Sequence, residues 1–171
     1  ATTFDDGQGE SDWSGKLQID WHVNNDVLAY AGVSRGIKAG SFNAPITGGG
    51  VSSFGQETLI SYETGLKTTL ADGKVRLNTS VFYYDYQDYQ GFTFEALASR
   101  IVNLDATSMG AEVELVWNPA DGWDVLLGAS VLDTEVDVTL PSGRATENKL
   151  PLASDYTING LIRKGWEIGE N

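Results

Sequence analysis

The chain has 171 residues, with 11 basic and 24 acidic side chains and a formal net charge of −13 at pH 7. This balance argues against a nucleic-acid partner, because phosphate contacts need a basic patch. The sequence has no Cys, which excludes both a disulfide framework and a cysteine-ligated metal site. Hydrophobic residues make up 41%, Gly is abundant at 20 residues and Pro scarce at 4, which favours a folded chain with many strands and tight turns.

Two kinds of membrane or export segment are missing from the sequence. No apolar run reaches 18 residues, so we expect no transmembrane helix. The opening stretch, ATTFDDGQGESDW, has neither the basic nor the apolar region of a signal peptide. We therefore expect either a cytosolic protein or a piece of a longer mature chain.

Alternation of apolar and polar residues predicts seven strands and no helix. Most of these segments are much longer than the five or six residues usual for a strand. The segment at 123–137 has apolar residues at both parities, which predicts a bulge or complete burial there. In chain order the predicted strands span residues 13–23, 27–38, 57–70, 74–90, 100–117, 123–137 and 152–164.

The connections between these strands alternate in length. Short turns are predicted at 24–26, 71–73 and 118–122, long loops at 39–56 and 136–150, and an intermediate connection at 91–99. Short periplasmic turns and longer extracellular loops are typical of an outer-membrane barrel. Two zones of aromatic residues, one beside the short turns and one toward the other strand ends, indicate the interface girdles of such a barrel. They are Trp13, Trp117 and Trp123, and Tyr83, Tyr84, Tyr86 and Tyr89.

Three stretches carry a combination of motifs whose order and spacing are more specific than any one of them. The first is YAGVSRGIKAGSFN (Tyr30–Asn43), and the second begins with ETLISYETGLK at Glu57 and ends with the aromatic YYDYQDYQ at Gln90. The third, Asn103–Glu135, contains NLDATSMGAEVE. Together they resemble consecutive strands in the barrel of TonB-dependent outer-membrane receptors, over roughly residues 15–165.

The resemblance implies an all-β fold, an antiparallel up-and-down meander of about seven long strands within a 22-stranded transmembrane barrel. Residues 1–171 would then be one part of that barrel, without its plug domain, a TonB box, a signal peptide or the closing C-terminal strand. It implies neither an enzyme nor a cofactor. The intact protein would lie in the outer membrane of a Gram-negative bacterium, in contact with its lipid.

The resemblance also implies a function for the intact protein. It would take up a scarce nutrient, most often a ferric siderophore but also cobalamin, haem or an oligosaccharide. Energy would come from the TonB complex, which acts through the protein's own plug domain. We expect this chain to supply barrel wall, lumen lining and part of the ligand-binding loops.

Site residues follow from the strand pattern and the resemblance. Arg35 and Lys38 could hold an anionic ligand, or they could instead pair with neighbouring acids. Aromatic rings at the same ends could stack on the ligand, or could belong to the girdle. With Asn43, the expected ligand residues are Arg35, Lys38, Phe42, Tyr86, Tyr89 and Phe92. Polar residues expected to face the lumen or plug are Lys16, Asp20, Glu63, Lys67, Arg76, Glu112 and Glu114.

Other classes of protein fit the pattern less well. A soluble β-sandwich carbohydrate-binding module would explain the amphipathic strands and the exposed aromatics, but not the strand lengths or the loop alternation. A complete eight-stranded barrel needs one more strand than the seven predicted. An enzyme lacks a visible nucleophile and base, since His22 is the only histidine. The acids Asp133, Glu135 and Asp137 share one strand face, which indicates a hydrated rim sooner than a cation site.

Overall fold

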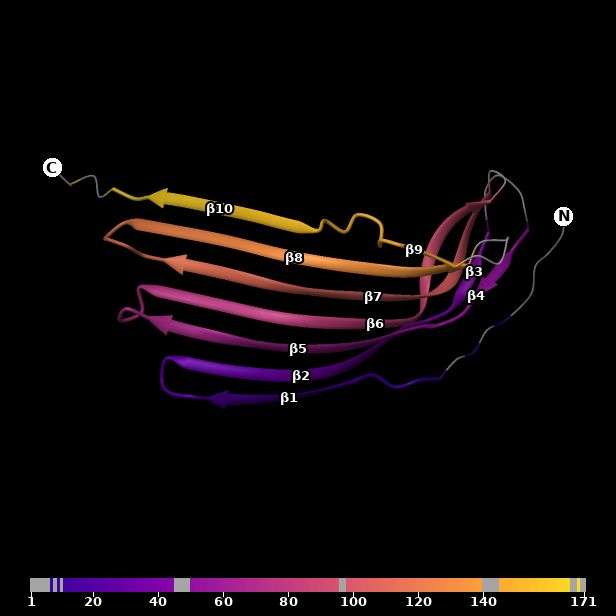
Figure 1. Ribbon diagram of the computed structural model, residues 1–171, viewed down its shortest axis with the longest axis horizontal. Helices are drawn as coiled ribbons and strands as arrows, with labels where there is room; N and C mark the ends of the chain where they lie inside the picture. Colours follow the sequence, from indigo (N-terminus) through magenta and orange to yellow (C-terminus); the bar gives the residue numbers. More distant parts are fainter. Residues whose placement is uncertain are drawn as a thin grey trace.

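The computed structural model describes residues 7, 9, 11–44, 50–95, 98–139, 145–166 and 169. The main sheet has one layer of antiparallel strands in the order β1-β2-β5-β6-β7-β8-β10, and Figure 1 shows these strands side by side. Their bounds are Gly15–His22 (β1), Val27–Lys38 (β2), Glu57–Leu70 (β5), Val75–Glu95 (β6), Ala98–Trp117 (β7), Trp123–Thr139 (β8) and Tyr156–Lys164 (β10).

Three short strands complete the fold. β3 (Ser41–Asn43) pairs with β4 (Ser52–Phe54) in a sheet of their own, and β9 (Ala145–Asn148) pairs with the end of β8. The described segments contain no helix that is long and apolar enough to cross a membrane.

The predicted strands at 27–38 and 57–70 agree with β2 and β5 to the residue. The predicted connection at 91–99 is wrong, because β6 continues to Glu95 and β7 begins at Ala98. These two strands form a hairpin that rises past its neighbours at one end of the sheet (Figure 1). The strands inside the two long loops were not predicted, because three or four residues are too few to show a period of two.

The register places polar and apolar side chains on opposite faces of the sheet. Tyr30 lies opposite Gly65, Gly65 opposite Ser80, and Ser80 opposite Glu112. We call this side the polar face; it carries Lys16, Gln18, Asp20, His22, Tyr30, Ser34, Ser61, Glu63, Lys67, Arg76, Asn78, Ser80, Glu112, Glu114, Ser130 and Asn159. The other side, the apolar face, carries Leu17, Ile19, Trp21, Val33, Ile60, Tyr62, Leu66, Val75, Leu77, Val81, Tyr83, Met109, Val113, Leu115, Leu127, Val131 and Ile158.

Almost no hydrophobic side chain is covered by another layer of protein. Within the described ranges the buried hydrophobic residues are Ala106, Val125 and Val136, whereas Leu17 is 67% exposed and Val81 57% exposed. A β-sandwich would bury the inner face of each of its two sheets. The structure therefore does not support the sandwich alternative.

The predicted irregularity lies in a different strand from the expected one. β8 pairs with β7 in unbroken register, with Leu126 on the polar face and Leu127 on the apolar face. The register shift occurs in β6 between Tyr86 and Tyr89, where Asp88 has a φ of 56°. An extra residue on one strand bends that strand and redirects the side chains beyond it.

The predicted aromatic girdles need two corrections. Tyr83 faces the apolar side, but Tyr84 and Tyr86 face the polar side, because neighbouring residues in a strand alternate. Trp13 lies at the long-loop end of the sheet, since Gly15 pairs with Arg35 and β1 runs from there to the short turn. Trp21, which was not predicted, is on the apolar face at the short-turn end and is 66% exposed.

Candidate functional site

The centre of the polar face is organised around Tyr30. Its hydroxyl donates a hydrogen bond to Glu63 Oε1 at 2.6 Å, and Lys67 Nζ lies 5.6 Å from the centre of its ring. Gly65 pairs directly with Tyr30, and a Cβ on Gly65 would lie 2.7 Å from the Tyr30 hydroxyl oxygen. The three residues of the Glu-x-Gly-x-Lys motif thus all contact Tyr30. Glu63 accepts its hydrogen bond, Gly65 leaves space for its ring, and Lys67 places a cation near the ring. Tyr30 was not among the predicted site residues, because its role depends on a residue one strand away.

A second aromatic ring lies over a second glycine. Phe82 pairs with Gly110, where a Cβ would lie 2.7 Å from the Phe82 ring. Phe82 also stacks on Tyr84 with 4.8 Å between ring centres. Two residues beyond Gly110, Glu112 points to the same face, and the next acid, Glu114, accepts a hydrogen bond from Asn78 Nδ2 at 3.1 Å. The Gly-x-Glu-x-Glu segment therefore repeats this arrangement: Gly110 leaves space for an aromatic ring, and Glu112 and Glu114 place carboxylates on the same face.

An aromatic hollow of about 570 Å³ lies beyond Phe82 toward the long-loop end of the polar face. Tyr86 and Tyr89 meet edge to face across the bulge, with ring centres 5.8 Å apart. Hydroxyls and one carboxylate complete the lining, from Ser108, Ser130, Thr134 and Glu112. Such a mixture of rings and a few polar groups is typical of small-molecule sites. The rings of the aromatic hollow could stack on a planar group of a ligand, and its polar side chains could accept hydrogen bonds from that ligand.

One wall of this aromatic hollow comes from the connection between β9 and β10. The Leu150 backbone N–H donates to Thr134 Oγ1 at 3.1 Å, and the Leu132 N–H donates to the Asp155 carbonyl at 2.9 Å. Between them, Leu152 has a φ of 61° and a fully exposed side chain. These bonds hold the connection against β8 at the mouth of the hollow.

Polar side chains tie the ends of the 39–56 loop to β6 and β7. Asn103 accepts from the Gly55 N–H at 2.7 Å and donates to the Gly55 carbonyl at 3.1 Å. Glu57 accepts from the Gln90 N–H at 2.8 Å, and Lys38 Nζ lies 3.5 Å from the same carboxylate. Lys38, an expected ligand residue, is thus at the rim of the polar face beside an acid.

Arg35, the other expected cation, lies on the apolar-face register at the long-loop end. Its guanidinium donates to both Asp12 carboxylate oxygens, at 2.8 and 2.7 Å, and lies 4.8 Å from the centre of the Trp13 ring. The hydrogen bond from Arg35 lowers the pKa of Asp12 to about 2, with further lowering by the Trp13 N–H and Gln56. The structure therefore separates Arg35 from Lys38, which the sequence analysis grouped together.

The remaining ligand candidates lie farther along the loops. Phe42 and Asn43 are on β3, opposite Ser53 and Ser52. Phe92 pairs with Ile101 in the far part of the β6–β7 hairpin and is 62% exposed. Among the expected ligand residues, Tyr86 and Tyr89 are in direct contact with each other.

All the residues expected to face the lumen share the polar face. Asp20 accepts a hydrogen bond from Gln18 at 2.7 Å, and Lys16 lines a small hollow with Tyr30 and Glu63. Arg76 lines another hollow beside His22 and Glu114. In the described part of the chain, no three His, Asp or Glu side chains are grouped so as to hold a metal ion. Which of these residues contact a plug or a ligand stays a prediction.

A single sheet with one apolar and one polar face is the architecture of a membrane barrel wall. The family comparison agrees: residues 1–169 match the model described as TonB dependent receptor-like, beta-barrel. The chain belongs to this family. The TonB-dependent receptor barrel is a receptor domain rather than an enzyme, and the strand meander matches a segment of it.

A solved structure supports the same fold. The chain is similar to the ferric yersiniabactin uptake receptor FyuA from Yersinia pestis, with a TM-score of 0.70 and 24% sequence identity. The match covers 87% of this chain and 22% of the FyuA chain. The chain thus spans about a fifth of the length of that receptor.

Proposed function

We propose that this chain is part of the barrel wall of an active transporter in the outer membrane of a Gram-negative bacterium. The transporter takes up a scarce nutrient of the ferric-siderophore class, and the TonB complex supplies energy through a plug domain. The observation that carries the proposal is the two-faced single sheet, together with membership of the TonB-dependent receptor barrel family. FyuA is a ferric yersiniabactin uptake receptor, which supports the choice of ligand class.

The apolar face has the height that a bilayer requires. From Tyr62 to Leu70, β5 rises about 27 Å at 3.4 Å per residue. A strand tilt of about 35–45° shortens this to roughly 20 Å along the membrane normal, close to the apolar band of outer-membrane barrels. Trp21 and Trp117 lie at one edge of this band and Tyr62 and Tyr83 at the other, which supports contact with lipid through this face.

The polar face would line the lumen. Its ordered side chains, centred on Tyr30 and Glu63, suit contact with a plug, and a water-filled lumen accommodates its charges. The residues proposed to face the plug or lumen are Lys16, Asp20, Glu63, Lys67, Arg76, Glu112 and Glu114.

The aromatic hollow is the part of this face best suited to a ligand. Tyr86 and Tyr89 would stack on it, and Lys38 at the rim would meet an anionic group. Loop residues Phe42 and Asn43, with Arg35 and Phe92, would complete the extracellular contacts.

The test is uptake of a labelled ferric siderophore by cells that make the full-length receptor. We compare Tyr86→Ala with Tyr83→Ala, because these tyrosines lie on opposite faces of β6. Tyr86→Ala should weaken ligand binding by about 2 kcal/mol or more, the threshold for an interface hot spot, and Tyr83→Ala should not. Uptake should also cease in a strain without TonB. No TonB-dependent uptake of any ferric siderophore in a panel, by a receptor present in the outer membrane, would contradict the proposed ligand class.

A further inference from the structure

Two side-chain amides join the ends of the 39–56 loop to the β6–β7 hairpin. The first is Gln90, whose Nε2 donates hydrogen bonds to the Ala39 carbonyl at 2.9 Å and to the Gly55 carbonyl at 3.1 Å. Ala39 precedes β3 and Gly55 follows β4, so one amide holds together the entry and the exit of these paired strands. We call the two strands the β3–β4 ribbon; β4 contacts β7, and Figure 1 shows the ribbon beside the hairpin.

Asn103, on β7, makes the second connection. Its Oδ1 accepts from the Gly55 N–H at 2.7 Å, and its Nδ2 donates to the carbonyls of Gly55 at 3.1 Å and Asp88 at 2.8 Å. The amide thus uses its acceptor and both of its donors. Because Asp88 lies in the β6 bulge, Asn103 bonds the exit of the β3–β4 ribbon and the bulge at the same time.

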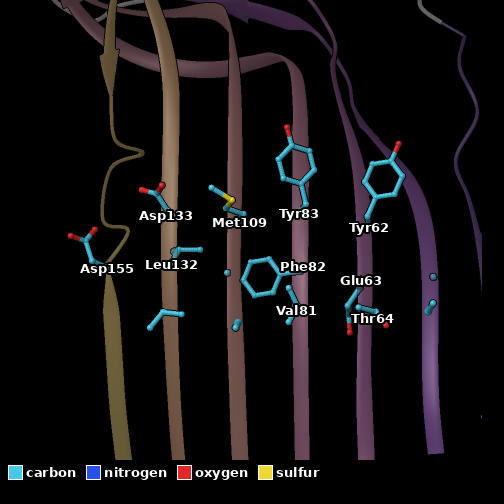
Figure 2. A pocket seen from close by; sticks show the side chains of 15 residues that line it. Tyr62, Glu63, Thr64, Val81, Phe82, Tyr83, Met109, Leu132, Asp133 and Asp155 are labelled. Atoms are coloured by element: carbon cyan, nitrogen blue, oxygen red, sulfur yellow. The ribbon is translucent and has the colours of Figure 1, made fainter.

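The bulge is what brings Tyr86 and Tyr89 together. Residues three apart on a regular strand point to opposite faces, yet these two rings meet edge to face and line the same hollow. Where the strands are regular, a tyrosine pair comes from two of them, as Figure 2 shows for Tyr62 and Tyr83 on the apolar face. The contact between Tyr86 and Tyr89, which we call the tyrosine pair, therefore depends on the conformation of the bulge.

Side chains of β7 hold both backbone polar groups of the bulge residue Asp88. Its N–H donates to Asp105 Oδ1 at 3.3 Å, and its carbonyl accepts from Asn103. A residue other than glycine with a φ of 56° is uncommon and persists where its surroundings fix it. Loss of the Asn103 amide should therefore release the β3–β4 ribbon and loosen the tyrosine pair together.

We propose that Asn103 is a positioning residue for ligand binding, which fixes the β3–β4 ribbon relative to the tyrosine pair. The ribbon carries Phe42 and Asn43, so the ligand meets both groups as one prearranged surface. A surface that is ordered before the ligand arrives lowers the entropy cost of binding. Asn103 acts through these groups and not by contact with the ligand. The inference rests on the proposed function, in which both groups contact the ligand.

The first measurement is ligand binding to cells that make the full-length receptor and lack TonB. The probes are catecholate, hydroxamate and phenolate siderophores loaded with radioactive iron. For the siderophore that the wild type binds, Asn103→Ala should raise the half-saturating concentration about tenfold, because the ribbon and the rings must then be ordered on binding. The maximal amount bound should not change. A residue that only stabilises the barrel would instead lower the amount of receptor, and with it the maximal amount bound.

Asn118→Ala is the matched control at the short-turn end of the sheet. Asn118 Nδ2 donates to Asp124 Oδ1 at 2.7 Å, so this variant also loses a side-chain hydrogen bond but should keep the half-saturating concentration of the wild type. Gln90→Ala removes the other connection of the β3–β4 ribbon and should weaken binding in the same way. It serves as the test should Asn103→Ala fail to reach the membrane.

A second measurement needs no ligand. Hydrogen–deuterium exchange of the full-length receptor, followed by mass spectrometry, should show faster exchange at residues 50–56 in Asn103→Ala and in Gln90→Ala. Asn118→Ala should exchange there at the rate of the wild type. Residues 86–90 should also exchange faster in Asn103→Ala, because the bulge loses the same amide.

Wild-type half-saturating concentrations for both Asn103→Ala and Gln90→Ala would overturn the proposal. So would unchanged exchange at residues 50–56 in both variants. Failure of the proposed function looks different: the wild type would then bind none of the siderophores, while exchange at residues 50–56 would still rise in Asn103→Ala and Gln90→Ala.

Discussion

The two faces of the sheet satisfy their polar groups in different ways. On the polar face, side chains bond one another across strands, as in Tyr30 to Glu63 and Asn78 to Glu114. On the apolar face, the hydroxyls of Thr64 and Thr68 turn back to backbone carbonyls, those of Tyr30 and Leu77, at 2.9 Å each. Side chain to side chain networks suit a wet lumen, whereas hydrocarbon offers no partner and favours local bonds to the backbone. The two faces of the sheet therefore suit two different environments, water on the polar face and hydrocarbon on the apolar face.

The test with the largest expected effect on stability places an arginine on each face of the sheet. Leu66 and Lys67 are adjacent in β5, and Leu66 lies in the middle row of the apolar face. Leu66→Arg should cost about 2–4 kcal/mol of unfolding free energy in lipid vesicles, because the charge enters hydrocarbon. Lys67→Arg keeps its charge on the polar face and should cost well under 1 kcal/mol. Urea titration of the full-length receptor measures both, and equal costs would contradict the assignment of the faces.

A second test concerns the space over Gly65. Gly65→Ala puts a methyl group 2.3 Å from the Thr79 carbonyl oxygen and 2.7 Å from Tyr30, so backbone or ring must move. We expect a loss of about 1–3 kcal/mol, as for other overpacked sites. Gly36→Ala is the matched control, since nothing lies within 4 Å of its added Cβ. The same urea titration should leave Gly36→Ala near the wild type; similar losses for both would show that Gly65 has no special role.

A third test removes one hydroxyl from each face. Tyr30→Phe breaks the hydrogen bond to the Glu63 carboxylate and should cost about 1.5 kcal/mol, the low end for a hydrogen bond to a charged group. Tyr62→Phe on the apolar face should cost almost nothing, because its hydroxyl makes no hydrogen bond within the described residues. Should Tyr62→Phe be the more harmful of the two, the hydrogen-bonded organisation of the polar face would be refuted.

The smallest expected effect is on the contact between Asp12 and Arg35. Hydrogen bonds from Arg35 lower the pKa of Asp12 to about 2 in the folded chain, below the ordinary value of about 3.9 in an unfolded chain. The stabilisation is therefore fully present above about pH 4 and is lost as the pH falls toward 2. The difference in stability between wild type and Asp12→Asn should shrink over that range. A difference that stays constant from pH 5 to pH 2 would show that this carboxylate does not titrate with the contact.

Much of the fold was predictable because a period of two needs only local sequence. The opposite facing of Leu66 and Lys67 follows directly from their adjacency. The same rule would have corrected one site prediction and one girdle prediction. Arg35 and Lys38 are three residues apart and so lie on opposite faces, and the adjacent residues Tyr83 and Tyr84 do so as well. The alternation of faces along each strand is visible in the sequence. These residues were grouped by the strand end at which they lie, without regard to the face on which each side chain points.

Other features depend on contacts that no local pattern contains. Tyr30 meets Glu63 only once the register of β2 and β5 is fixed. The bulge at Tyr86 and Tyr89 depends on how β7 pairs with β6. The aromatic hollow needs both that bulge and the connection after β9, so its lining could not be assembled from the sequence.

The turn between β5 and β6 has a consequence for how the wall assembles. Ala71, Asp72 and Gly73 all have positive φ, at 53°, 54° and 87°, so the chain reverses within three residues. Local closure of this kind brings two strands together in microseconds, and contacts near in sequence speed folding. We expect the wall to grow hairpin by hairpin from its short turns. Lengthening the 71–73 turn should therefore slow refolding of the full-length receptor more than lengthening the 39–56 loop by the same number of residues.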